Sequence, residues 1–227
     1  MALVVGLFVN LGLWQVRRHG ERQTENAVGS ARIAAPVSDL DVLLAAVGDD
    51  IDSLEWRAVT VEGTYRPEWE VLVRSAVVDG RAGFAVVTPL QTVDDQIVLV
   101  NRGWVPLEFD EPPVPASPPE GRVEVAGRLR LPQTRPVVGA EDAEPPNRVV
   151  SRVDPDWFEA LIGRMPVPMW VQASGREDRL PIPLDVPTFD DPGPHIAYAV
   201  QWFSFAAIAI VGFALLIRST AHRRGVR

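Results

Sequence analysis

The chain has 227 residues and a net charge of −8, from 30 acidic residues and 22 basic residues that are all arginine; it has three histidines and no cysteine. All 30 acidic residues lie between Glu21 and Asp191, and 16 of the arginines lie between Arg22 and Arg179. This acidic central region excludes nucleic acid as a partner, and the composition also excludes a disulfide framework and a zinc or iron–sulfur site.

The first 14 residues carry no charge, but a membrane span takes about 17 to 25 residues. We interpret residues 1–18 as a first transmembrane helix whose beginning is missing. A secretory signal peptide is the alternative, although the segment has neither a basic start nor a small-residue cleavage site.

The central region, residues 19–194, has the pattern of a β-rich domain. A short helix is predicted over residues 38–48, with Ser38 as its N-cap and Gly48 at its end. Alternating apolar residues then predict seven strands, and residues 154–163 predict a second helix with Asp154 as its cap. The strands cover residues 56–65, 69–75, 83–90, 96–105, 122–131, 148–153 and 169–174.

The spacing of these elements predicts an α+β membrane protein whose outer domain is a mainly antiparallel sheet or open barrel. The first two strands are joined by a short, hairpin-like connection, and the third and fourth form a hairpin. Residues 179–194 are rich in proline and predict an extended return path to the membrane.

The last apolar segment, residues 196–217, has 22 residues without charge and spans roughly 33 Å as a helix, enough to cross a bilayer. We predict a second transmembrane helix over residues 195–217 and a basic cytoplasmic tail over residues 218–227. By the positive-inside rule both termini are then cytoplasmic and residues 19–194 lie outside the membrane. Arg17 and Arg18 disagree with this rule, because they follow the first span on the outer side.

No hydrolytic site is recognisable. The sequence has no GxSxG or HExxH motif and no glycine-rich phosphate loop. The paired carboxylates at 49–50, 94–95 and 190–191 are typical of solvated loops. We therefore predict a protein that is not an enzyme.

His195 begins the last helix in the stretch GPHIAYAVQWF. Gly193 can serve as the N-cap and Pro194 as the first helical residue, which places His195 in the first turn at the outer membrane surface. The positive end of the helix dipole disfavours a protonated ring there, and iron ligation requires a neutral ring nitrogen.

Large aromatic residues follow His195 on helical spacing: Tyr198 at i+3, Trp202 at i+7 and Phe205 at i+10. This spacing predicts one helical face with an imidazole and three aromatic rings. The alternative is an interfacial aromatic belt with an incidental histidine.

Two further stretches stand out. The first helix ends in LGLWQVRR, which places Trp14 near Arg17 and Arg18 at the same membrane surface, where arginine could hold carboxylates or simply snorkel. The fourth strand ends in VNRGWVP, where Gly103 permits a close approach or a bend between Arg102 and Trp104. Taken alone, this second stretch is most often a structural bulge.

LGLWQVRR, LVNRGWVP and HIAYAVQWF, in this order, resemble the Surfeit-locus-protein-one family of the Shy-one type. The resemblance covers nearly the whole chain. It implies an assembly factor for cytochrome c oxidase that binds haem a and presents it to oxidase subunit I, with haem a synthase as a further partner. The absence of lysine and the abundance of arginine, alanine and proline favour a bacterial plasma membrane over a mitochondrion.

The resemblance also implies roles for individual residues. His195 would be the ligand of the haem iron; the other haem contacts would be Trp14, Gln15, Arg17, Arg18, Tyr198 and Trp202. His19 is a candidate second ligand. Arg102, Gly103, Trp104 and Gln201 would form partner or structural motifs. The alternative function is a haem-independent scaffold that holds an oxidase subunit through the outer β domain.

Overall fold

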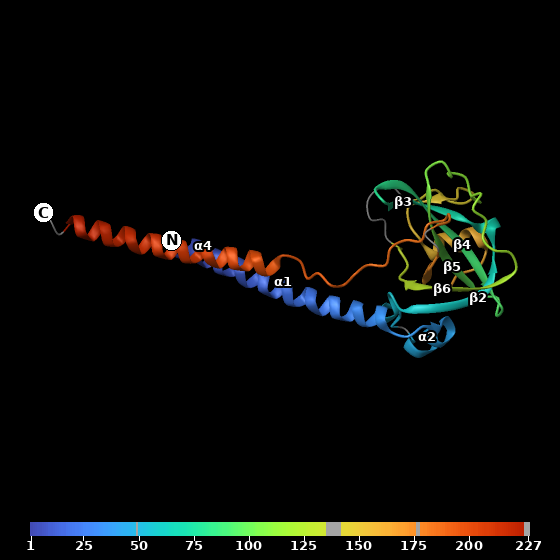
Figure 1. The fold of residues 1–227 in the computed structure, drawn as a ribbon, viewed down its shortest axis with the longest axis horizontal. Coiled ribbons are helices and arrows are strands. Elements are labelled where there is room, and N and C mark those ends of the chain that lie inside the picture. Colours follow the sequence, from blue (N-terminus) through green and yellow to red (C-terminus); the bar gives the residue numbers. More distant parts are fainter. Residues whose placement is uncertain (49, 135–141, 176–177, 225–227) are drawn as a thin grey trace. The chain divides into compact units, whose positions relative to one another are not determined.

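The protein is described here from a computed structural model that covers residues 1–48, 50–134, 142–175 and 178–224 (Figure 1). The chain forms two compact units. Met1–Ala31 and Pro187–Arg227 make up one, called here the helical unit. Arg32–Val186 make up the other, called here the β domain.

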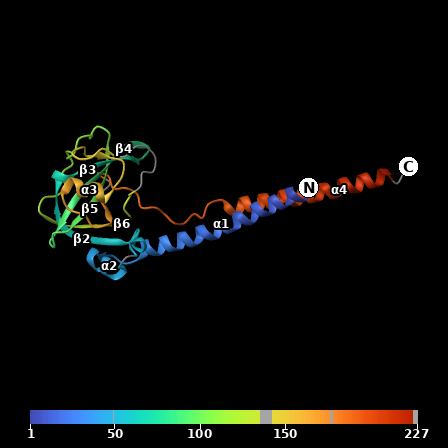
Figure 2. The ribbon, with the colours of Figure 1, turned by 180° about the vertical axis from the view of Figure 1, so that it is seen from behind.

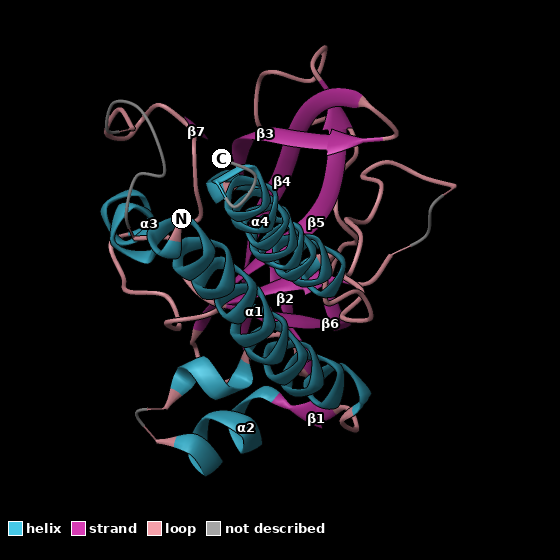
Figure 3. Ribbon diagram, turned by 90° about the vertical axis from the view of Figure 1, so that its left-hand side faces the viewer, coloured by secondary structure: helices cyan, strands magenta, loops and turns pink. Residues whose placement is uncertain are grey.

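The helical unit consists of two long helices, α1 (Ala2–Ala34) and α4 (His195–Arg224). Figure 3 shows them side by side, and residue contacts establish that they run antiparallel, because low-numbered residues of α1 meet high-numbered residues of α4. α1 does not end near residue 18: it continues as one helix through a charged second half. At 33 residues it is about 50 Å long.

The β domain is built on eight strands within the described residues, in the order β1-β2-β6-β8-β5-β4-β3-β7. β4 is long and serves two partners: its first part pairs with β3, and its last residues pair with β2. Because β2 also pairs with β6 at the other end of the order, β2, β6, β8, β5 and β4 close into a barrel. The strands are β1 Ser38–Asp39, β2 Ala58–Tyr65, β3 Val71–Val78, β4 Arg81–Thr92, β5 Ile97–Pro106, β6 Arg122–Arg130, β7 Val149–Val150 and β8 Trp170–Ala173.

The structure confirms the α+β class and a strand at each of the seven predicted places, and it adds the short β1. Most pairings are antiparallel, but β1–β2, β3–β7 and β5–β8 are parallel. The hairpin predicted between the first two strands is wrong, because a short 3₁₀ helix, Pro67–Trp69, separates β2 from β3 and β3 pairs with β4 instead. The β4–β5 hairpin is confirmed.

Two short helices close the domain. α2 (Leu40–Val47) places Leu40 and Leu43 in the barrel core, and its N-cap is Asp39, one residue after the predicted Ser38, because Ser38 and Asp39 pair with β2. α3 (Pro155–Ile162) has the predicted cap at Asp154, whose side chain accepts from the Asp156 amide. α3 buries Phe158 in a second core with residues of strands β3 to β5. Figure 2 shows the α3 ribbon beside these strands.

Candidate functional site

His195 is the first residue of α4, and hydrogen bonds of the preceding residues stabilise the start of this helix. The Gly193 amide donates to Asp191 Oδ1 at 2.7 Å, and the Tyr198 amide donates to the Pro194 carbonyl at 3.1 Å. Pro194, rather than the predicted Gly193, therefore carries the first helical acceptor. His195 lies in the first turn, as the sequence predicts.

The His195 side chain contacts α1. Its Nδ1 lies 2.9 Å from Oε1 of Gln15, a residue 180 positions earlier in the chain. A carboxamide oxygen can only accept a hydrogen bond, so this contact places the ring proton on Nδ1. In the neutral ring, Nε2 then carries the lone pair that a metal ligand requires.

The aromatic residues near His195 do not form one face. Trp202 stacks on Phe8 of α1 at 5.7 Å between ring centroids, and Phe205 approaches the same ring at 5.8 Å. These two rings therefore hold α4 against α1. Tyr198 and Trp14 are each 48% exposed and remain available to a ligand or to lipid.

The spacing of buried residues on α4 explains this division. His195, Ala199, Trp202 and Ala206 alternate in steps of four and three, the spacing of a helix–helix seam, and Ala199 and Ala206 are almost fully buried. Tyr198 is one residue away from this seam and so faces outward. The prediction placed His195 and Tyr198 on one face of α4, but only His195 lies at the helix–helix seam.

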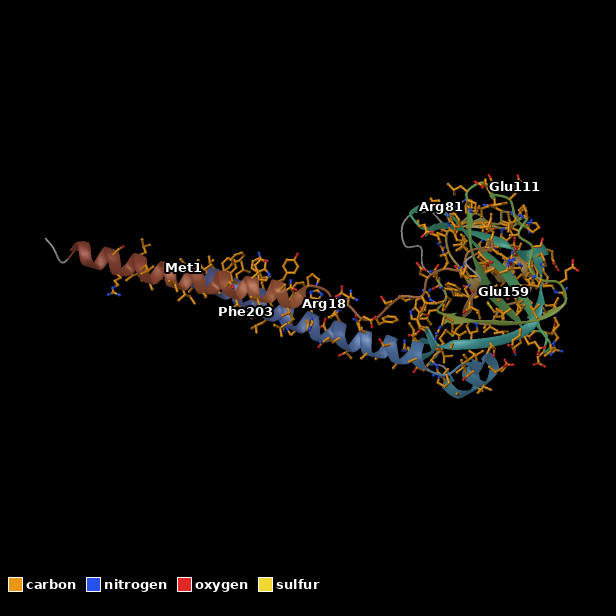
Figure 4. The ribbon with its side chains drawn as sticks, in the orientation of Figure 1. Met1, Arg18, Arg81, Glu111, Glu159 and Phe203 are labelled. Atoms are coloured by element: carbon orange, nitrogen blue, oxygen red, sulfur yellow. The ribbon has the colours of Figure 1, made fainter. Side chains whose placement is uncertain are left out.

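Gly12 lets the helices approach closely. Gly12 is buried, and a Cβ atom at this position would lie 2.5 Å from the ring of Phe203 on α4. Phe203 is labelled in Figure 4. Phe8 and Gly12 were missing from the predicted site. The signal that could have found them is the run Phe8, Gly12, Gln15 and His19, which has the same alternating steps of four and three.

The polar residues near Gln15 differ in whether their side chains already have partners within the protein. Arg18 pairs with Glu21 of the same helix at 3.1 Å. Arg17 is exposed and pairs with no carboxylate among the described residues. His19 is partly buried, and its Nδ1 is buried without a hydrogen-bond partner in the described part of the chain. On α4, Gln201 is exposed.

Arg102 lies in a buried network of the β domain, away from solvent. Its Nη2 donates to Glu70 Oε2 at 2.8 Å, its Nε to Thr88 Oγ1 at 2.8 Å, and its Nη1 to the Ala116 carbonyl at 2.9 Å. Glu70, which is 0% exposed, also accepts from the Val114 amide at 2.7 Å. Each of the three guanidinium nitrogens donates one hydrogen bond, so Arg102 of β5 is joined to β4, to the residue before β3 and to the loop after β5.

Gly103 and Trp104 form a second structural contact. The register between β4 and β5 shifts at this point, which leaves Arg102 as the extra residue of a bulge. Gly103 has φ 125°, and a Cβ there would collide with the Ile182 carbonyl. The buried Trp104 exchanges two backbone hydrogen bonds with Ile182, at 2.6 and 2.8 Å. The segment that approaches Gly103 is therefore the chain's own return path.

Within the described ranges, no three histidine, aspartate or glutamate side chains gather as a metal site. Haem iron differs from a bare ion, because the macrocycle supplies four nitrogens and the protein needs to add only one or two. His195 has a second ring nitrogen, Nε2, that is not used in the contact with Gln15. His19 has a buried Nδ1 without a hydrogen-bond partner in the described part of the chain.

These features define a class of protein in which a small β-barrel domain shares one chain with an antiparallel helix pair. Within the described residues, the helix over His195–Ser219 is long and apolar enough to cross a membrane, with a mean hydropathy of 2.2. The SURF1 family matches residues 2–207. The chain belongs to the SURF1 family.

Relatives extend over most of the chain. An uncharacterized SURF1-like protein of Mycobacterium tuberculosis is 30% identical over 209 residues, which cover 90% of this chain and 76% of the relative. A SURF1-like protein of Monosiga brevicollis is 28% identical over 233 residues, with 96% and 86% covered. One of Rickettsia bellii is 24% identical over 224 residues, with 96% and 89% covered.

Proposed function

We propose that this protein is a membrane-anchored, non-enzymatic assembly factor of haem–copper cytochrome c oxidase, which binds haem a and presents it to oxidase subunit I. Haem a synthase would supply the cargo. Membership of the SURF1 family supports the assembly role. The single observation that carries haem binding is the contact between His195 Nδ1 and Gln15 Oε1.

In this proposal His195 binds the iron through Nε2, and Gln15 is a positioning residue. By accepting from Nδ1, Gln15 fixes the tautomer and the ring orientation, as outer partners of ligating histidines commonly do. Trp14 and Tyr198 have the exposed rings needed to pack on a macrocycle. Trp202 contributes indirectly, because it keeps α4 against Phe8.

Arg17 is a better candidate than Arg18 for binding a haem propionate. Arginine binds carboxylates bidentately, and Arg17 has no carboxylate partner among the described residues. Arg18 already pairs with Glu21, so binding a propionate would require it to leave that pair.

His19 is proposed as a second iron ligand. It follows Gln15 by four residues, which places the two side chains on one face of α1. A buried ring nitrogen without a hydrogen-bond partner is costly, and this cost would be relieved if ligand binding reorganised the ring.

We further propose a two-span arrangement in a bacterial plasma membrane. α4 would cross the bilayer alongside the apolar first half of α1, and the charged second half of α1 would extend beyond the membrane core, which is about 30 Å thick. Both termini would be cytoplasmic and the β domain extracytoplasmic.

The test is the absorption spectrum of the full chain purified in detergent from cells that make haem a. His195→Ala is expected to lower the bound haem per protein at least about tenfold, and Gln15→Leu to lower haem affinity about tenfold, the usual cost of losing an outer ligand partner. Gln201→Ala, an exposed carboxamide on α4, is the matched control. Equal haem in the wild type and His195→Ala would refute His195 as the ligand.

The same spectra test His19 separately. With two histidine ligands the iron is six-coordinate and low-spin, and His19→Ala should convert it to a high-spin form while haem remains bound. Unchanged spin state in that variant would remove His19 and leave the role of His195 intact.

The haem-independent scaffold remains the second hypothesis for this family member. Arg102 and Trp104 are buried, so they can support such a surface but cannot be contacts on it. Cross-linking distinguishes the two functions: a haem-free His195→Ala protein that still captures oxidase subunit I and supports oxidase assembly would favour the scaffold.

A further inference from the structure

The β domain contains a cavity of about 520 Å³ between β3, β5, β6 and the return path of the chain, within the volume range of small-molecule sites. All its lining residues lie in the β domain, so the cavity is independent of the helical unit and of haem binding. The residues on which the argument depends are Arg74, Asn101, Arg130, Arg152, Trp170 and Leu184.

The lining has three arginines and no acidic residue. This is unusual for a domain in which residues 32–186 hold 15 arginines against 26 acidic residues. Guanidinium groups in such a cavity provide several N–H donors in a fixed plane, the geometry that binds carboxylate or phosphate oxygens.

Two of these arginines are only loosely engaged by neighbouring carboxylates. Arg74 and Arg152 share Asp142, at long distances of 3.9 and 3.8 Å. Arg152 Nε also lies 3.5 Å from Asp154 Oδ2. Asp142 makes its short hydrogen bonds to Ser151, whose amide and hydroxyl donate to it at 2.7 and 2.8 Å. Charge-assisted bonds to guanidinium are normally 2.7–2.9 Å long, so donors on both arginines remain available.

The third arginine is held rigidly. Arg130 donates to Glu55 at 2.8 Å and to Gln172 at 2.9 Å, and its guanidinium lies over the rings of Trp56 and Trp170, at 3.7 and 5.1 Å. Arg130 is therefore a rigid part of the cavity lining, with its charge balanced by Glu55, rather than a flexible arm.

Asn101 adds a polar group deep in the cavity. It is only 3% exposed, and its Oδ1 accepts from the Gly103 amide at 2.9 Å. Its Nδ2 has no partner among the described residues, so two N–H donors are left for an acceptor that enters the cavity.

The remaining lining is apolar. Trp170 and Val73 belong to the second hydrophobic core, and Leu184 packs against it. Leu184 is held in place because Gln172 Nε2 donates to its carbonyl at 2.9 Å. The cavity lining thus combines hydrogen-bond donors and positive charge with apolar surface.

We propose that this cavity binds a small organic anion, with a carboxylate or phosphate group at Arg74, Arg152 and Asn101 and an apolar body against Trp170 and Leu184. The anionic group of such a ligand accepts hydrogen bonds from the free donors, and its apolar body covers the apolar surface of the cavity. An inorganic anion would meet only the first requirement, and a neutral apolar molecule only the second.

The test is isothermal titration calorimetry on the full chain in lipid nanodiscs, with empty nanodiscs as the blank. Three probes separate the contributions: phthalate has both the charge and the apolar body, inorganic phosphate has the charge alone, and dimethyl phthalate has the body alone. Phthalate should bind saturably, and each of the others at least about tenfold more weakly, because each loses one set of contacts.

Arg74→Gln should weaken phthalate binding about tenfold, since it removes charged donors. This arginine is half exposed, so the substitution should not prevent folding. Arg122→Gln is the matched control: Arg122 is equally exposed, pairs with Glu62 and does not line the cavity. No saturable phthalate binding, phosphate binding as tight as phthalate, or an Arg74→Gln affinity equal to the wild type would each overturn the proposal.

Discussion

Tyr65 illustrates how burial alters a single side chain. It lies in the barrel core at the end of β2, and the Arg102 guanidinium is 6.0 Å from its ring centroid. Burial raises the pKa of Tyr65 to about 12, while the positive charge of Arg102 acts in the opposite direction. Burial has the larger effect, because the phenolate would lose more hydration than one cation at this distance restores.

This shift predicts how stability depends on alkaline pH. The pKa is raised in the fold, so the stabilisation is complete below about pH 10 and is lost as the pH rises from 10 to about 12. The loss should be roughly 2 kcal/mol. The chain has no lysine and no cysteine and only two tyrosines, so few other groups titrate in this window.

The measurement is denaturant unfolding of the β domain within the full chain at pH 9 and at pH 12, for the wild type and Tyr65→Phe. The variant should show a much smaller decrease in unfolding free energy. Tyr198→Phe is the control, because Tyr198 is half exposed. An identical decrease in the wild type and Tyr65→Phe would show that Tyr65 does not cause the alkaline loss.

At the scale of elements, the helix pair depends on the seam between α1 and α4. Phe8, Gly12 and Gln15 of α1 meet Trp202, Phe203 and His195 of α4, so the apolar packing and the candidate ligand belong to one interface. The positions on both helices repeat in steps of four and three, as in antiparallel pairs that wrap around each other.

Two glycines of α1 provide a matched test of this packing. Alanine raises helix propensity by about 1 kcal/mol at either position. At Gly6 the added Cβ meets nothing within 4 Å, so Gly6→Ala should strengthen the pair slightly. At Gly12 it collides with the Phe203 ring, and overpacking of this kind costs about 1–3 kcal/mol. Gly12→Ala should therefore weaken the packing of α1 against α4.

The measurement uses spin labels on Leu3→Cys and Ile208→Cys, two exposed positions in a chain without native cysteine. The short inter-label distance should be lost at a lower SDS concentration in Gly12→Ala than in the parent, and at an equal or higher concentration in Gly6→Ala. The same midpoint for both variants would mean that Phe203 accommodates the added methyl group without cost.

At the scale of the whole molecule, the membrane arrangement that we propose from the charge distribution makes a prediction for each side of the membrane. Single cysteines test it. Ser117 lies exposed in the proline-rich loop after β5, and Ser219 lies at the end of the apolar segment of α4. The proposed topology places Ser117 outside and Ser219 on the cytoplasmic side.

A membrane-impermeant maleimide should therefore label Ser117→Cys in cells with a permeable outer layer and an intact plasma membrane. Ser219→Cys should react only after the membrane is opened. The cysteine-free parent chain is the blank. Labelling of Ser219→Cys alone would reverse the orientation, and labelling of both would contradict a crossing between the two positions.

The local elements were predictable because their signals are local. Alternation in the sequence located β2, β4, β5 and β6, and the Asp154 cap and Gly163 terminus marked α3 within a residue. The helix start at His195 followed from Gly193 and Pro194 in the same way. Such patterns depend on residues a few positions apart, which is the range over which backbone propensity and capping act.

The tertiary structure decided the contacts that join distant segments. Nothing in the local pattern paired Gln15 with His195, buried Glu70 beneath Arg102, or returned β4 to β2 to close the barrel. The sequence by itself determined the seven predicted strand positions, the two short helices and the start of α4 at His195, but neither β1 nor the full length of α1. Only the tertiary structure separated the buried Arg102 and Trp104 from the exposed Trp14 and Tyr198, because burial depends on neighbours supplied by remote parts of the chain.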